Sequence, residues 1–108
     1  MAEQNKFLNL LGIAKSAGAL SQGHDASLES LKKRKAYLCL VTNDASERLF
    51  KEFSFLTNDN KADLIRIPYT MDEVGAALSY RVAVLTVNNR GIADRLKEII
   101  NLQNGEEI

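Results

Sequence analysis

Two continuous apolar runs of strand length constrain the fold of this chain most strongly. They cover residues 37–42 and 82–87. A run without polar alternation is typical of a strand that is buried on both faces. Segments with helical spacing of apolar residues precede, separate and follow these runs. The sequence therefore predicts a sheet that helices cover on both sides.

The remaining patterns complete an alternation of helices and strands. Helical patterns cover residues 5–17, 25–34, 71–78 and 92–102, and a further helix ends near Leu56; shorter strand patterns cover residues 19–20 and 64–67. Such alternation predicts an α/β fold, a three-layer α/β/α sandwich with a central four-stranded mixed, mainly parallel sheet. We expect residues 1–108 to form one domain, with a frayed tail from about residue 103.

Polar residues mark where two of the predicted helices begin. After the first apolar run, either Asp44, with Glu47 three residues later, or Ser46 alone can cap the next helix. Thr70 and Glu73 have the spacing of a capping box, which predicts a short helix that begins at residue 71.

Charge and composition exclude several classes of protein. Lys and Arg together number 14, as do Asp and Glu, so overall charge alone would not hold nucleic acid. The segment Lys32–Lys35 is a local basic patch, or else a solvated helix end whose cations complement the helix dipole. No apolar run approaches the roughly 20 residues of a membrane span, and the first residues do not resemble a signal peptide. We expect a cytoplasmic protein without a membrane partner.

A glycine turn within residues 19–28 is the central candidate for function. Gly23 follows a short apolar piece and precedes a predicted helix, whose first backbone N–H groups have no partner within the helix. Such N–H groups bind anions, including phosphate. In alternating folds, ligands meet the loops at strand ends. Here those loops are residues 21–25, 43–46 and 79–81.

The residues that catalysis would need are scarce. His24 is the only histidine, and Cys39 lies in the middle of a predicted buried strand, where we expect an inert thiol. Asp25 and Asp44 could face each other across strand ends, although such aspartates are more often helix caps. The chain has no phosphate-loop pattern and no nucleophile-elbow pattern. We therefore predict that the protein is not an enzyme and has no metal site and no cofactor.

Several segments together resemble a known family. They are the glycine turn, residues 23–28, the basic entry to the apolar strand with its acidic exit, residues 35–46, and the Val-Gly-Ala-Ala-Leu segment, residues 74–78. In order and spacing they resemble the kink-turn RNA-binding ribosomal protein superfamily, of the L-seven-Ae and L-thirty-e type. Residues 10–18 and the Asp-Ala-Ser triplet that begins at Asp44 are similar to its bacterial YlxQ-like branch.

The resemblance implies a protein that binds a sharply bent RNA helix. In the family, a turn with the pattern Gly-x-Asn-Glu-x-x-Lys contacts sheared G·A pairs. Gly23 matches the glycine, but Asp25, Ala26 and Glu29 stand at the other three positions. Ionised Asp only accepts hydrogen bonds, whereas Asn also donates them. Glu29 places an anion where the family has a cation, which disfavours a nearby phosphate.

The candidate RNA-binding residues come from the turn, the basic helix end and the loops at the strand ends. They are Gln22, Gly23, His24, Asp25, Lys32, Lys33, Asp44, Tyr80 and Arg81. Tyr and Arg side chains stack on unstacked bases. Each candidate also has an ordinary structural alternative, as a polar turn residue, a cover for the sheet edge or a surface charge.

The leading hypothesis is a non-enzymatic, monomeric RNA-binding protein that contacts a kink-turn or similar bent RNA and is associated with the ribosome or translation. Its candidate partners are structured RNA, including ribosomal RNA, and ribosomal proteins. The alternative is a protein-interaction adaptor that kept the fold and lost RNA binding, because of Asp25, Ala26 and Glu29. A role at the strand ends in binding a small ligand or in catalysis is a third, weaker hypothesis.

Overall fold

The predicted alternation of helices and strands is present. A computed structural model describes residues 5–105. The elements follow in the order α1 (Lys6–Ser16), β1 (Leu20–Gln22), α2 (His24–Lys32), β2 (Leu38–Val41), α3 (Glu47–Asp59), β3 (Asp63–Arg66), α4 (Met71–Leu78), β4 (Val84–Val87) and α5 (Arg90–Gly105). The tail predicted to fray from residue 103 is helical as far as Gly105, and residues 106–108 lie outside the described part.

The four strands form one mixed sheet in the order β1-β4-β2-β3. β4 pairs antiparallel with both β1 and β2, whereas β2 and β3 pair in parallel. β1, β2 and β3 therefore share one direction, but the expectation of mainly parallel pairing is wrong. The reason is that β4 enters between β1 and β2 in the opposite direction, and alternation along the chain does not reveal this insertion.

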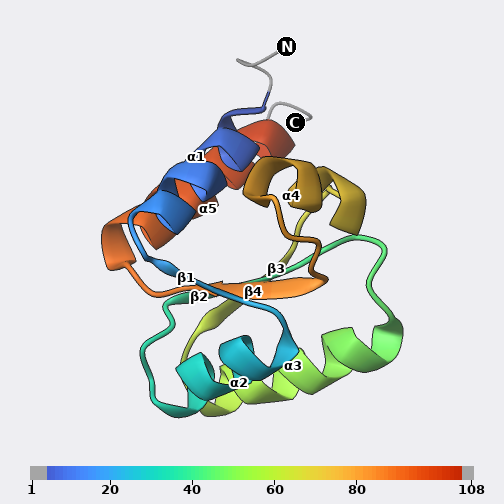
Figure 1. The fold of residues 1–108 in the computed structure, drawn as a ribbon. Coiled ribbons are helices and arrows are strands. Elements are labelled where there is room, and N and C mark those ends of the chain that lie inside the picture. The colour runs from blue at the N-terminus through green and yellow to red at the C-terminus, as the bar shows by residue number, and fades with distance from the viewer. Residues whose placement is uncertain (1–4, 106–108) are drawn as a thin grey trace.

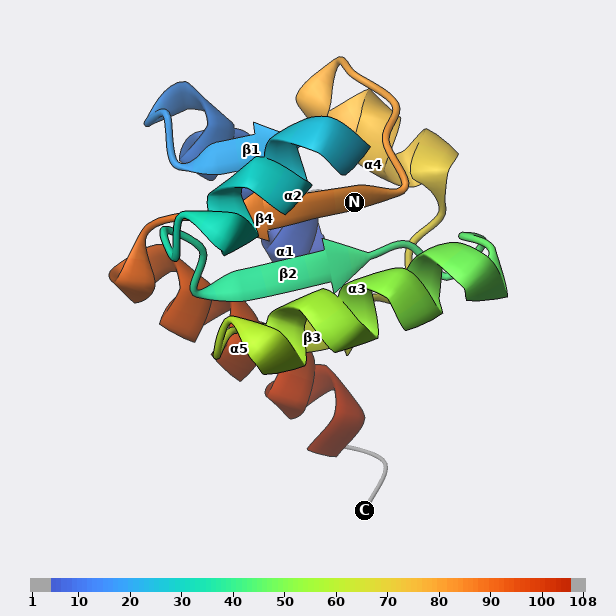
Figure 2. The same cartoon turned by 90° about the horizontal axis from the view of Figure 1, so that it is seen from below.

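Helices cover both faces of the sheet, as predicted. Figure 1 shows α1, α4 and α5 above the sheet and α2 and α3 below it. Seen from below in Figure 2, α2 and α3 lie side by side across the strands. The side chains of adjacent β2 residues point to opposite faces of the sheet. Leu38 and Leu40 pack with α1, α4 and α5. Cys39 and Val41 pack against α2 and α3. This division explains why the strand is apolar throughout.

Local signals explain where the helices begin. Ser46 caps α3 by accepting a hydrogen bond from the Leu49 N–H at 3.1 Å. Thr70 and Glu73 form the predicted capping box at the start of α4, with bonds of 3.1 and 2.9 Å. Both caps satisfy backbone N–H groups that have no partner within the helix.

Candidate functional site

Three loops meet at one edge of the sheet, at the carboxyl ends of β1, β2 and β3. The N–H of Gly23 donates to the carbonyl of Val84 at 2.9 Å, and the N–H of Thr42 donates to the carbonyl of Ala83 at 3.0 Å. These bonds place the glycine turn and the loop after β2 on either side of the segment that leads into β4. We call this region, residues 22–25, 42–46 and 79–83, the loop edge. The three loops that the sequence marked as candidates thus lie together.

The glycine turn at the loop edge has a backbone conformation that essentially only glycine adopts. Gly23 has φ 97° and ψ 173° and stands at the N-cap position of α2. It offers no side chain to cap the helix, so the N–H groups of the first turn have no side-chain acceptor. The positive end of the helix dipole adds to their attraction for anions. The turn is therefore a suitable place for a phosphate or a carbonyl edge of a base.

His24 connects α2 with α3. Its Nε2 lies 2.8 Å from a carboxylate oxygen of Glu52, and its Nδ1 lies 3.2 Å from Asp25. The imidazole also meets the ring of Phe53 edge-on, with 5.4 Å between centroids. The hydrogen bond to Glu52, followed by that to Asp25, raises the pKa of His24 above its ordinary value, although burial opposes this. His24 is thus a bridging residue with an increased tendency to carry positive charge.

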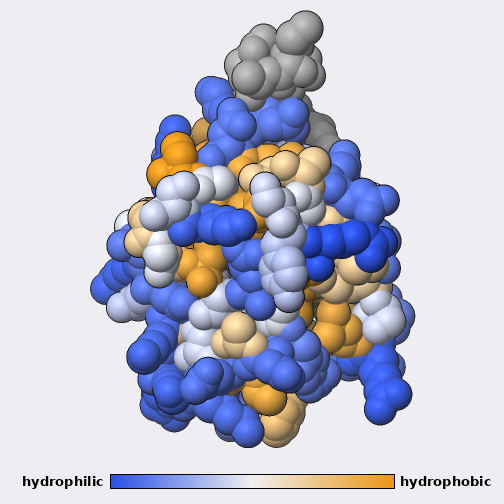
Figure 3. Space-filling model, in the orientation of Figure 1, coloured by the Kyte–Doolittle hydropathy of each residue, from blue (hydrophilic) through white to orange (hydrophobic). Residues whose placement is uncertain are grey.

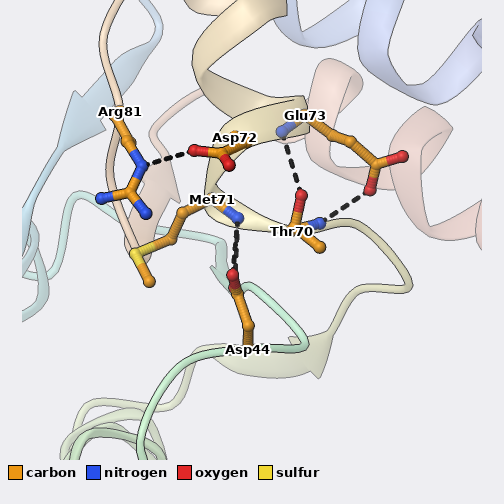
Figure 4. A network of polar contacts seen from close by, with 6 residues as sticks. All are labelled: Asp44, Thr70, Met71, Asp72, Glu73 and Arg81. Carbon is orange, nitrogen blue, oxygen red and sulfur yellow. Dashed lines mark hydrogen bonds and ion pairs between the residues drawn. The ribbon is translucent and has the colours of Figure 1, made fainter.

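Tyr80 and Arg81 are exposed on the loop between α4 and β4. Ser79 ends α4 in the left-handed conformation, with φ 60°, and turns the chain towards them. Tyr80 is 55% exposed. The Nε of Arg81 donates to Asp72 of α4 at 2.6 Å, as Figure 4 shows. This loop therefore presents an aromatic ring and a guanidinium group close to the glycine turn, where both could stack on a base.

Asp44 has a structural task at the loop edge. Its carboxylate oxygens lie 3.1 and 3.4 Å from the N–H of Met71, so it caps α4 rather than α3 (Figure 4). Partial desolvation raises the pKa of Asp44, but hydrogen bonds and the charge of Arg81 outweigh it and leave the pKa below its ordinary value. The side chain of Asp25 contacts His24 instead. The two aspartates thus serve different partners.

Lys32 and Lys33 lie at the other end of α2 from the loop edge. At 1.5 Å per residue, the helix separates them from Gly23 by about 14 to 15 Å. An open groove of about 380 Å³ along the helix joins the two ends and is lined by Asp25, Leu28, Glu29, Lys32 and Lys33. Within it, Lys33 forms an ion pair with Glu29 at 2.8 Å. The structure therefore separates these two lysines from the other candidates, which it gathers near Gly23.

The described part of the chain offers little support for a reactive thiol or a metal site. Cys39 is buried, and burial raises the pKa of its thiol to about 12, which leaves it protonated and unreactive. Among residues 5–105, no group of three or more His, Cys, Asp and Glu side chains could hold a metal ion. No described helix is long and apolar enough to cross a membrane. Figure 3 shows a largely hydrophilic face on which apolar residues form separate small patches.

Comparison with known proteins identifies the family of this chain. The model of the Ribosomal protein L7Ae/L30e/S12e/Gadd45 family matches residues 5–97. The chain belongs to this family. A relative from Enterococcus faecium, named RNA-binding protein YlxQ, is 27% identical over 101 residues, which cover 90% of this chain and 93% of the relative. The predicted resemblance, including its YlxQ-like branch, is confirmed.

Solved structures share the fold of this chain. One, a protein of unknown function from Bacillus halodurans C, has a TM-score of 0.83 and 21% identity, covering 89% of this chain and 97% of its own. Another, the Giardia lamblia 15.5kD RNA binding protein, has a TM-score of 0.71 and 20% identity, covering 87% and 81%. At these identities the likeness establishes the fold, and the predicted α/β sandwich is confirmed.

Two residues of the site could not be found from sequence motifs. Glu52 lies 28 positions after His24, and only the packing of α3 beside α2 brings them together. Asp72 lies nine positions before Arg81, across a helix and a turn. A sequence signal for Asp72 exists, since acidic residues are typical of the first turn of a helix, but that role does not predict an arginine partner.

Proposed function

We propose that this family member is a non-enzymatic protein that binds a kink-turn or a similarly bent structured RNA, as a monomer associated with the ribosome or with translation. The observation that carries the proposal is the Gly23 turn, with its uncapped N–H groups beside the exposed Tyr80 and Arg81. The name of the Enterococcus faecium relative states RNA binding, and that relative is covered almost along its whole length.

Each part of the site has a task that suits bent RNA. The backbone N–H groups after Gly23, together with Gln22, contact base edges or phosphates, because the glycine permits close approach. Both ring nitrogens of His24 are bonded to carboxylates, so His24 holds α2 against α3 beside the turn. Tyr80 and Arg81 stack on a base that the bend leaves unstacked. Lys32 and Lys33 attract the phosphates of a helix that lies along α2. Asp44 acts indirectly, by holding α4 at the loop edge.

The family's motif is altered in this chain, and the structure limits the consequence of one change. Glu29 lies in the groove along α2, where Lys33 partly neutralises it at 2.8 Å. Lys32 lines the same groove and contributes a further positive charge there. We therefore expect weaker RNA binding than the full motif would produce. The adaptor alternative predicts no RNA binding.

The direct test is a titration of the protein with a labelled kink-turn RNA. A control RNA in which G·C pairs replace the sheared G·A pairs forms a straight helix. We expect tighter binding to the kink-turn RNA, and an affinity that falls steeply as salt rises from about 50 to about 200 mM. Equal affinity for both RNAs would exclude kink-turn specificity, and absence of binding at the lower salt concentration would favour the adaptor.

A further inference from the structure

Helix α4 and the loop that carries Arg81 are in unusually close contact. A Cβ atom on Gly75 would lie 3.2 Å from the Cα and 3.3 Å from the Cβ of Arg81. The loop backbone therefore rests directly on α4 at the one position without a side chain. Any larger residue at position 75 would push the Arg81 backbone away by a few tenths of an ångström. Gly75 thereby determines where the loop lies.

Asp72 then determines how the Arg81 side chain points. The Nε of Arg81 donates to Asp72 at 2.6 Å, and Figure 4 shows the two terminal nitrogens turned away from that carboxylate. A guanidinium group has five N–H donors in a rigid fork, so a bond through Nε leaves the other four for a ligand. The side chains of Arg81 and Asp72 are 61% and 79% exposed. A pair this exposed contributes little to folding stability.

The helix end that carries Asp72 is itself held firmly. Asp44 accepts a hydrogen bond from the N–H of Met71, and Thr70 forms the capping box with Glu73. Figure 4 shows these contacts next to Asp72. The first turn of α4 therefore connects the loop after β2 with the loop before β4. A ligand of the loop edge would meet Arg81 in a fixed orientation.

We propose that Asp72 and Gly75 are positioning residues for RNA recognition, which fix Arg81 so that its terminal N–H groups meet the RNA. This inference rests on the proposed function. Charge and orientation predict opposite effects for Asp72. The negative charge of Asp72 should weaken RNA binding by repelling phosphates. Its hydrogen bond to Arg81 should strengthen RNA binding, because an Arg81 side chain that is already oriented loses less conformational entropy when RNA binds.

The decisive variant is Asp72→Asn, titrated with the kink-turn RNA at low salt. We expect about five-fold weaker binding, the usual size of coupling between residues in contact, although the variant has lost a negative charge. Its matched control is Glu98→Gln, which removes a carboxylate from another exposed pair, with Arg95 at 2.7 Å on α5. The control should bind RNA within about two-fold of the wild type. Equal or tighter binding by Asp72→Asn would overturn the inference.

A second variant tests the backbone contact. Gly75→Ala should weaken RNA binding by about three-fold or more, because the loop must move. Gly12→Ala is its control, since a Cβ there would meet only the Ala77 carbonyl, at an ordinary 3.7 Å. Both substitutions favour helix formation, so they differ in the loop contact rather than in propensity. Unchanged RNA affinity in Gly75→Ala would contradict the role of Gly75.

A double variant separates this inference from the proposed function. In an Arg81→Ala background, Asp72→Asn should cause no further loss of affinity, since the residue that it positions is absent. If Arg81→Ala binds like the wild type, the inference is overturned while RNA binding by the chain stands. If the wild type does not bind the kink-turn RNA at low salt, the proposed function is overturned and the inference with it.

Discussion

A glycine with positive φ lies near each end of β1, and the two glycines serve different purposes. The strand begins shortly after Gly18 and ends just before Gly23, and both glycines have positive φ, 73° and 97°. Gly18 ends α1: its N–H donates to Lys15, and the N–H of Ala19 donates to Ala14, the pattern of a Schellman motif. Gly23 begins α2 instead, and its N–H belongs to the sheet.

This difference shows why only one of the two glycines is a candidate for function. At Gly18 the hydrogen bonds of the turn satisfy the last carbonyls of a helix, so the motif is closed on itself. At Gly23 the first N–H groups of α2 have no side-chain acceptor and face the loop edge. A glycine with positive φ is therefore purely structural at one end of β1 and a candidate for ligand binding at the other.

The largest effect should come from placing a side chain at each glycine. Gly23→Val should reduce affinity for the kink-turn RNA by more than about 30-fold, as for a binding hot spot, because the added side chain prevents close approach. Gly18→Val should leave that affinity within about two-fold. Each variant should lose about 2 kcal/mol of stability from strain at positive φ. RNA titration and urea unfolding measure the two quantities separately.

The fold should survive both substitutions. A Cβ on Gly23 would meet only the side chain of Val82, at 3.9 Å, and a Cβ on Gly18 would meet nothing within 4 Å. Native circular dichroism in both variants is therefore the required control. If Gly18→Val and Gly23→Val lost RNA affinity equally, the proposed distinction between the two ends would be wrong.

A smaller effect should show how far the RNA surface extends from Gly23 along α2. Glu29→Lys should bind the kink-turn RNA about five-fold more tightly at low salt, with a steeper salt dependence, because it removes repulsion and releases Lys33 from its ion pair. Glu98→Lys on α5 makes the same charge change away from the loop edge. Equal gains in both variants would indicate general charge attraction, and weaker binding by Glu29→Lys would place the RNA elsewhere.

Features that depend on neighbouring residues could be predicted from the sequence. The spacing of Thr70 and Glu73 predicted the capping box, and the apolar runs predicted strands buried on both faces. The loop before β4 reaches the loop edge only because β4 runs antiparallel to its neighbours, but the meeting of the loops after β1 and β2 could be predicted, because strands that share a direction bring their carboxyl ends to one edge. Each of these inferences uses local periodicity or a general rule of topology.

Features that depend on packing between distant segments could not be predicted. Asp44 has the spacing of a cap for α3, yet it reaches Met71, 27 positions away, because β2 and β3 lie side by side. The insertion of β4 between β1 and β2 likewise leaves no periodic signal in the sequence. In the sequence, Gly75 is simply a small residue of a predicted helix, and only the structure shows that Arg81 packs against it.

The smallest predicted effect concerns pH, and it should also distinguish the two ends of β1. His24 follows Gly23, and its pKa is raised, chiefly by the hydrogen bond to Glu52. A raised folded-state pKa stabilises the protein fully below the unfolded value of about 6.5, and this contribution is lost as pH rises through the folded value. The side chain is 43% exposed, so solvent screening limits the contribution to about 0.3 kcal/mol.

Urea unfolding between about pH 5.5 and about pH 8.5 measures this contribution, and the chain suits the experiment because His24 is its only histidine. The free energy of unfolding of the wild type should fall by this small amount as pH rises. In His24→Gln and Glu52→Gln the free energy of unfolding should depend less on pH. Gly18→Val should keep the wild-type pH dependence, since its substitution lies at the other end of β1. An unchanged profile in Glu52→Gln would show that the contact between α2 and α3 does not hold the proton on His24.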